Sequence, residues 1–233
     1  MKKINVLDKG YIRLVDVMGD DDTVVNAARV SFDKEADKYT DEQNKRLIDF
    51  LAREGHDSPF RHAVMQFEVY APMMVTRQWE KYLIGSNNSE FGARNESSRR
   101  YITENEEFYI PEANEWRSKP EANIKQGSGE PIDENIGKWF TEALNDVIKS
   151  GELLYNDAMK HGIAPEQARL FLPAYGMYVR FRWTATLQTV AHLIKQRTAD
   201  DAQYEFRLYA EAIKELALDK FPVSLGALLK ERD

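Results

Sequence analysis

The stretch "MYVRFRWTATLQTVAHLIKQR", residues 177–197, places a strand directly before a helix. Apolar and polar side chains alternate in its first half, which is typical of a strand with one face in a protein core. In its second half the apolar residues take the spacing of a helix, which we expect over residues 188–197. The stretch therefore favours an α/β chain in which helices cover a sheet.

Strands and helices recur along the rest of the chain. "AVMQFEVYAP" at 63–72 also alternates and predicts a strand, and two shorter runs predict a strand pair around the turn at Lys9-Gly10. Thr40 and Gln43 form a capping-box pattern at the start of a helix. The helices that the sequence predicts span residues 22–32, 40–55, 73–83, 135–159 with a weak point at Gly151, 165–172, 188–197 and 201–218.

These elements predict one domain over residues 1–233. Proline, glycine and charged residues accumulate near 111–131, which predicts a flexible surface loop and not a domain boundary. With few strands and many helices, the fold class is α/β of the α+β type.

The composition excludes several classes of protein. The chain has no cysteine, which excludes disulfides, thiolate metal sites and a cysteine nucleophile. Its formal net charge of −7 disfavours binding to nucleic acid and to anionic membranes. The N-terminus does not have the pattern of a signal peptide, and no apolar run approaches the roughly 18 residues of a membrane span. We expect a cytoplasmic protein without nucleic-acid or membrane partners, in which local arginine clusters bind any anionic ligand.

Three segments concentrate side chains that could carry chemistry. "GHDSPFRH" at 55–62 holds two histidines in a turn, but their separation of six residues, without a thiolate or HExxH partner, argues against a metal site. "NESSRRY" at 95–101 combines hydroxyl groups with two arginines, which suits a phosphate. Arg169 and Arg197 lie on predicted helices among apolar residues. The ordinary alternatives are a solvated turn, an arginine-rich surface loop and structural ion pairs.

Taken together, the motifs resemble the flavin-dependent thymidylate synthases over nearly the whole chain. The matching pieces stand in the family's order and are "LDKGYIRLVDVMGDD", "AARVSFDKE", "GHDSPFRH", "RQW", "NESSRRY", "EFYIP", "ARLFLP", "YVRFRW" and "RTADDAQYE". The resemblance implies a small, mostly antiparallel sheet flanked by several helices, in a homotetramer with active sites at subunit interfaces. It also implies one-carbon transfer from methylenetetrahydrofolate to C5 of dUMP, giving dTMP, with FAD and NADPH as the reductants and no metal.

The resemblance assigns individual residues to the substrate and the cofactors. The residues implied in substrate binding are Gln78, Glu96, Ser97, Ser98, Arg99, Arg100, Arg169 and Arg197. Arg197 is also implied as the catalytic residue, because its permanent charge can stabilise negative charge at N3 of uracil and so make C5 nucleophilic. The residues implied in cofactor binding are His56, Ser58, Lys81, Glu96 and His192.

The flavin side of the site departs from the family's pattern. The family signature is Arg-His-Arg, seven residues and a serine, whereas this chain has Lys81-Tyr82-Leu83 and a longer distance to Ser98. Gln188 lies in a stretch where the family usually supplies Asn and Arg, His192 takes an Asn position and Asp201 a His position. The nucleotide side matches better. Three hypotheses follow: a thymidylate synthase with an altered flavin site, a folate-dependent pyrimidine deoxynucleotide hydroxymethyltransferase that has lost or altered its use of flavin, and a non-catalytic nucleotide-binding relative.

Overall fold

The computed structural model describes residues 2–30, 35–82, 94–97, 107–121 and 127–230. Its strands are β1 (Lys3–Val6), β2 (Gly10–Met18), β3 (Val64–Pro72), β4 (Arg94–Glu96) and β5 (Tyr178–Thr186). Its α-helices are α1 (Asp21–Arg29), α2 (Asp41–Arg53), α3 (Met73–Trp79), α4 (Glu134–Lys160), α5 (Pro165–Ala168), α6 (Leu187–Arg197), α7 (Tyr204–Leu218) and α8 (Pro222–Leu229). Short 3₁₀ helices are η2 (Ala36–Lys38), η3 (Ser58–Arg61), η4 (Arg169–Phe171) and η5 (Ala174–Gly176).

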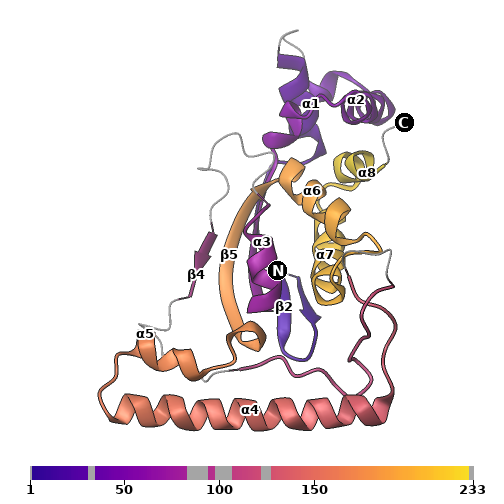
Figure 1. Ribbon diagram of the computed structural model, residues 1–233. Helices are drawn as coiled ribbons and strands as arrows, with labels where there is room; N and C mark the ends of the chain where they lie inside the picture. The colour runs from indigo at the N-terminus through magenta and orange to yellow at the C-terminus, as the bar shows by residue number, and fades with distance from the viewer. Residues whose placement is uncertain (1, 31–34, 83–93, 98–106, 122–126, 231–233) are drawn as a thin grey trace.

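The strands form one five-stranded antiparallel sheet in the order β1-β2-β3-β5-β4 (Figure 1). β3 and β5 pair along their whole length, from Val64 opposite Thr186 to Pro72 opposite Tyr178. The two longest alternating runs of the sequence therefore lie side by side in the sheet. The predicted fold class, a small antiparallel sheet with flanking helices, is confirmed.

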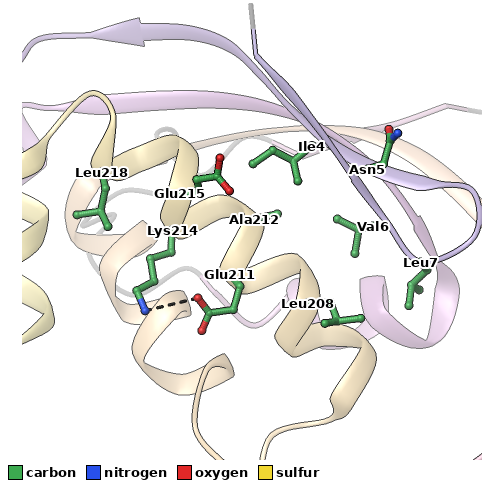
Figure 2. A pocket seen from close by; sticks show the side chains of 10 residues that line it. All are labelled: Ile4, Asn5, Val6, Leu7, Leu208, Glu211, Ala212, Lys214, Glu215 and Leu218. Carbon is green, nitrogen blue, oxygen red and sulfur yellow. Dashed lines mark ion pairs between the residues drawn. The ribbon is translucent and has the colours of Figure 1, made fainter. Parts of the chain in front are cut away.

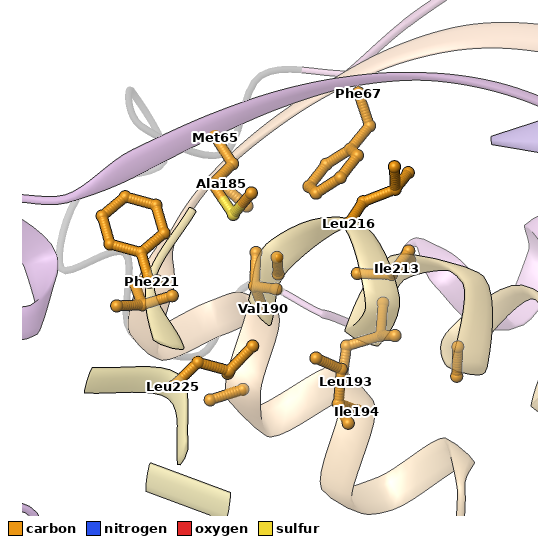
Figure 3. Close-up of a cluster of buried hydrophobic side chains, with 14 of the residues drawn as sticks. Met65, Phe67, Ala185, Val190, Leu193, Ile194, Ile213, Leu216, Phe221 and Leu225 are labelled. Carbon is orange, nitrogen blue, oxygen red and sulfur yellow. The ribbon is translucent and has the colours of Figure 1, made fainter. Parts of the chain in front are cut away.

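The main core lies between one face of this sheet and the helices α6, α7 and α8 (Figure 3). The side chains that meet there include Met65, Phe67, Ala185, Val190, Leu193, Ile194, Ile213, Leu216, Phe221 and Leu225. Full burial of one large apolar side chain contributes about 1.5–3 kcal/mol before the entropy of ordering is counted. This packing fixes α6 against the sheet, and with it the residues at both ends of α6.

The opposite face of the sheet carries a network of polar side chains. Glu68 on β3 accepts hydrogen bonds from Arg13 on β2, at 2.8 Å, and from the hydroxyl of Tyr11, at 3.0 Å. Arg182 on β5 lies 3.3 Å from the same carboxylate and donates to Gln66 at 3.0 Å. Burial alone would raise the pKa of Glu68, but the bonds from Arg13 and Tyr11 lower it below its ordinary value.

The long helix α4 lies across one end of the sheet (Figure 1) and is continuous through Gly151. The predicted weak point is therefore wrong. Gly151 is buried, and a Cβ atom at this position would lie 2.6 Å from the carbonyl oxygen of Phe171. The glycine allows α4 to approach η4 closely. Several apolar side chains of α4 are exposed, among them Trp139 at 61% and Leu153 at 72%.

Other predicted boundaries need correction. The helix predicted over 73–83 ends at Trp79, because the amides of Lys81 and Tyr82 bond to carbonyls three residues back and tighten the last turn. The helix predicted over 165–172 is α5 followed by η4, since Leu172 precedes a proline and is extended. Helix α8 and strand β4 were not predicted. The segment near 111–131 has no helix or strand in its described residues 111–121 and 127–131.

Within the described ranges, no helix combines the length and the apolar character needed to cross a membrane. Nor does this part of the chain bring three or more metal-binding side chains together.

Candidate active site

Arg197, the last residue of α6, is held between aromatic side chains. Its Nε donates a hydrogen bond to the hydroxyl of Tyr82. Its guanidinium carbon lies 5.4 Å from the ring centre of Tyr82 and 5.1 Å from that of Phe206. Contacts of this kind stabilise a cation by about 0.5–2 kcal/mol. The Nε edge is thus engaged, while the two terminal amino groups make no hydrogen bond to any residue that the structure describes.

Gln78 lies close to the chain segment that follows Arg197. Its Nε2 donates a hydrogen bond to Oε1 of Gln203, whose own Nε2 donates to Glu205 at 2.9 Å. The neighbouring Trp79 is buried and stacks on Phe206 with 5.2 Å between ring centres. This core contact fixes the last turn of α3, so that Gln78 and Arg197 belong to the same region of the molecule.

Strand β4 carries Glu96 to the edge of β5, with Ser97 directly after it. The amide of Ser97 donates to the carbonyl of Arg180 at 2.8 Å. Arg94, at the start of β4, pairs with Glu80 at 3.1 Å and with Glu96 at 2.8 Å. Because Glu80 directly follows α3, these pairs bring Glu96 towards the end of α3, where Gln78 lies.

The turn predicted at 55–62 is tied to the start of α6. Nε of Arg61 donates to Oε1 of Gln188 at 2.6 Å, and Nε2 of Gln188 donates to Asp57 at 2.9 Å. Phe60 in the same turn is fully buried. The turn is therefore anchored by a buried ring and by a side-chain network.

His56 and Ser58, the two candidate residues of this turn, are exposed. They lie near the N-terminal end of α6, whereas Arg197 ends that helix, which is about 15 Å long at 1.5 Å per residue. One chain by itself therefore does not bring these residues to Arg197.

His192 lies between the two ends of α6 and is half-buried. Its ring centre is 5.7 Å from that of Tyr82. Burial, and then the nearby charge of Lys195, lower the pKa of His192 below its ordinary value. The imidazole is therefore neutral at neutral pH and adds no second positive charge beside Arg197. Lys81, just before Tyr82, is exposed.

Arg169 lies apart from these residues. It is exposed in η4, and its Nε donates to the carbonyl of Glu166 at 3.3 Å. It makes no ion pair within the described part of the chain. Figure 1 shows α5, which directly precedes it, beside α4 and away from α6. The remaining candidates, Ser98, Arg99 and Arg100, lie outside the described residues.

Comparison with known proteins gives one consistent result. The family model described as "Thymidylate synthase complementing protein" matches residues 13–223. The chain belongs to the flavin-dependent thymidylate synthase family. It is 36% identical to the flavin-dependent thymidylate synthase of Thermosipho africanus over 97% of this chain and 93% of the relative. It is 39% identical to that of Thermus thermophilus over 96% and 77%.

A solved structure agrees with this family membership. The UMP/dUMP methylase PolB from Streptomyces cacaoi, bound with 5-Br dUMP, superimposes with a TM-score of 0.80 at 26% identity, covering 96% of both chains. The resemblance that the motifs indicated is confirmed, and so is the prediction of an enzyme of the flavin-dependent thymidylate synthase type.

The residues present fit the flavin that the family name implies. An exposed ammonium at Lys81, an exposed hydroxyl at Ser58 and an exposed imidazole at His56 are donors for the phosphates and hydroxyls of a dinucleotide. Gln188 has its amide oxygen and one of its two N–H donors engaged by Arg61 and Asp57. Of these donors, Lys81 stands at a position of the family signature, whereas His56 and Ser58 lie outside it.

Two residues that contact the candidate site carry little signal in the sequence. Tyr82 departs from the Arg-His-Arg pattern, and nothing in the sequence indicates that it contacts Arg197. Gln203 lies inside the matching piece "RTADDAQYE", and that was its one available signal.

A pocket of about 550 Å³ lies elsewhere, between β1 and α7 (Figure 2). Val6 and Leu208 line its apolar part, and the ion pair of Glu211 with Lys214, at 3.5 Å, lies at one side. None of its lining residues belongs to the candidate site.

Proposed function

We propose that this chain transfers a one-carbon unit from methylenetetrahydrofolate to C5 of dUMP and yields dTMP. The observation that carries the proposal is the setting of Arg197, a permanent cation fixed by its Nε, whose two terminal amino groups make no hydrogen bond within the described part of the chain. The membership of the chain in the flavin-dependent thymidylate synthase family supports the reaction. The likeness to a UMP/dUMP methylase supports the substrate class.

In this proposal, Arg197 acts on the pyrimidine ring. Two neighbouring donors on one edge of a guanidinium match two neighbouring acceptors, such as a carbonyl oxygen of uracil and N3 once it has lost its proton. Negative charge drawn to that side of the ring is stabilised by a donor that is already oriented, and C5 becomes nucleophilic. The ring is activated without a cysteine adduct, which agrees with a chain that has no cysteine.

The nucleotide would be bound by residues around β4 and α3. Gln78, Glu96 and Ser97 belong to this group, with Ser98, Arg99, Arg100 and Arg169 as further candidates from the sequence. A carboxylate at Glu96 suits a sugar hydroxyl better than a phosphate. Its pairing with Arg94 at 2.8 Å offsets its charge and so reduces its repulsion of a phosphate nearby.

The cofactors in this proposal are FAD and NADPH, with methylenetetrahydrofolate as co-substrate. Flavin, when bound, supplies the hydride that completes the methyl group. Residues proposed to hold the cofactors are His56, Ser58, Lys81, Glu96 and His192. The separation of His56 and Ser58 from Arg197 within one chain supports a homotetramer whose sites form between subunits. The cytoplasmic location stays a prediction from the sequence.

A second candidate is a hydroxymethyltransferase that acts on a pyrimidine deoxynucleotide with the same folate. It needs the methylene carbon and water but no net hydride. The observations that favour it are the replacement of Arg-His-Arg by Lys81-Tyr82-Leu83 and the engagement of Gln188 with Asp57. Both lie on the flavin side.

One purification tests these candidates. The protein is isolated without added flavin and its absorbance spectrum is recorded. It is then incubated with methylenetetrahydrofolate and NADPH, with or without FAD, together with either dUMP or UMP, and the product mass is measured. A methylated nucleotide that forms only with flavin supports the thymidylate synthase. A hydroxymethylated product, or turnover that does not depend on flavin, overturns it in favour of the second candidate.

A further inference from the structure

Tyr82 occupies the middle of the triplet that replaces Arg-His-Arg, and its side chain points into the protein. The residue is 5% exposed, although the neighbouring Lys81 is exposed. Its ring lies 5.7 Å from that of His192 and 6.0 Å from that of Phe206. Its hydroxyl accepts the hydrogen bond from Nε of Arg197. A position that the family resemblance places at the flavin thus contacts the arginine proposed to act on the pyrimidine.

The geometry of this contact determines how Arg197 can be used. An arginine side chain at the end of a helix has many rotamers, and a single charge does not select one of them. A bond at Nε fixes one edge of the planar guanidinium, and the rings of Tyr82 and Phe206 restrict its tilt. The opposite edge, whose two terminal amino groups have no partner among the residues that the structure describes, suits a ligand with two acceptors.

We infer that Tyr82 is a positioning residue whose hydroxyl holds Arg197 by Nε and turns the terminal amino groups towards the pyrimidine ring. The inference rests on the proposed function for the identity of the ring. Tyr82 acts through Arg197 and does not itself touch the reacting atoms. This gives the altered triplet a role on the nucleotide side of the site.

The contact persists over the working range of pH. Burial raises the pKa of Tyr82 above its ordinary value, and the charge of Arg197 opposes this rise without reversing it. The hydroxyl therefore stays protonated and keeps a lone pair for the arginine. The neutral state of His192 next to it preserves the orientation, because no second cation repels the guanidinium.

The contact can be measured without any nucleotide. In protein labelled with ¹⁵N-arginine, the Nε–H signal of Arg197 is assigned by its loss in Arg197→Lys, and its exchange with water is followed. Tyr82→Phe keeps the ring and removes the acceptor, so exchange should become about ten-fold faster, the ratio expected when one charge-assisted hydrogen bond is lost. Tyr178→Phe is the matched control, since Tyr178 is 2% exposed and its hydroxyl bonds to Asp8. Equal exchange in wild type and Tyr82→Phe would overturn the inference.

A cycle of nucleotide affinities tests the role in binding. We expect Tyr82→Phe to weaken dUMP binding about ten-fold in the wild-type background and to change nothing in Arg197→Ala. The same loss in both backgrounds would show a general structural effect and overturn the inference. A wild-type protein that binds neither dUMP nor UMP would instead overturn the proposed function, while the exchange measurement still decides the contact between Tyr82 and Arg197.

Discussion

Asp21 accepts a hydrogen bond from the backbone amide of Ser224 at 2.7 Å, and a second one from the amide of Val223 at 3.0 Å. Asp21 begins α1, and the two amides belong to the first turn of α8, which opens with Pro222. The first amides of a helix have no partner within the helix and carry partial positive charge. A carboxylate from the other end of the sequence satisfies them here and joins the first and last helices.

Asp21→Ala should therefore lower the free energy of unfolding by about 1–2 kcal/mol, the usual cost of losing a helix cap. Denaturation with urea measures the change. Asp22→Ala is the matched control, because Asp22 lies in the same turn and is exposed, and slight desolvation together with the neighbouring carboxylates raises its pKa. The control should leave stability unchanged or raise it slightly. Equal losses in both variants would contradict the capping role.

Replacing each of two helical glycines, Gly226 and Gly151, with alanine should change the stability of the protein in opposite directions. At Gly226 a Cβ atom would meet nothing within 4 Å, so Gly226→Ala should stabilise α8 by up to about 1 kcal/mol through helix propensity. At Gly151 the added carbon would lie 2.6 Å from the carbonyl oxygen of Phe171. Gly151→Ala should therefore destabilise the protein by about 1–3 kcal/mol, as overpacking does. Thermal unfolding of the two variants side by side is sufficient, and a stabilised Gly151→Ala would show that α4 does not pack as described.

Glu68→Gln should weaken the fold in a pH-dependent manner. Because the pKa of Glu68 is below its ordinary value of 4.5, its contribution is complete above that pH and is lost as the pH falls through the lowered value. At pH 7 the variant should lose about 1–3 kcal/mol, since Arg13 and Tyr11 lose a charged partner. As the pH falls through that lowered pKa, the variant should approach the wild type. Glu42→Gln, at an exposed pair with Arg46, should change stability by less than about 0.5 kcal/mol over the same range of pH.

Arg197→Ala should abolish turnover while the fold remains intact. Removal of a preorganised charge that stabilises a transition state costs on the order of 10²–10³ in rate, and the loss of orientation adds to this. Arg197→Lys keeps the charge but not the two-donor edge, so it should recover little activity. Circular dichroism and thermal unfolding check the fold of both variants. Near-normal turnover in Arg197→Ala would remove this residue from the mechanism.

Much of the fold could be predicted because its patterns are local. The alternation in β3 and β5 and the capping box at Thr40 and Gln43 were read directly, and the hydrogen bonds of that box are present at 3.0 and 3.3 Å. Helix α8 was missed because its apolar residues do not follow one face, and its N-terminus depends on Asp21, about 200 residues away in the sequence. β4 has three residues, too few for an alternating pattern.

The site was predictable only as a set of residue types. The sequence indicated Gln78, Glu96 and Arg197, and the structure places them around the ends of α3, β4 and α6. The sequence could not indicate that Tyr82 contacts Arg197, because that contact depends on where α3 ends and on the rings that bury Trp79. Nor could it indicate that Gln188 is engaged by its neighbours, since that depends on the packing of η3 against α6.

β5 also limits how this protein can evolve. Phe181, Trp183 and Ala185 point into the core, while Arg180, Arg182 and Thr184 alternate with them on the polar face. Substitutions on the polar face can change its chemistry with little effect on the core. An insertion or deletion of a single residue would exchange the two faces and put arginines where the aromatic rings now lie. We therefore expect the length of this strand to be far less tolerant of change than the identity of its polar residues.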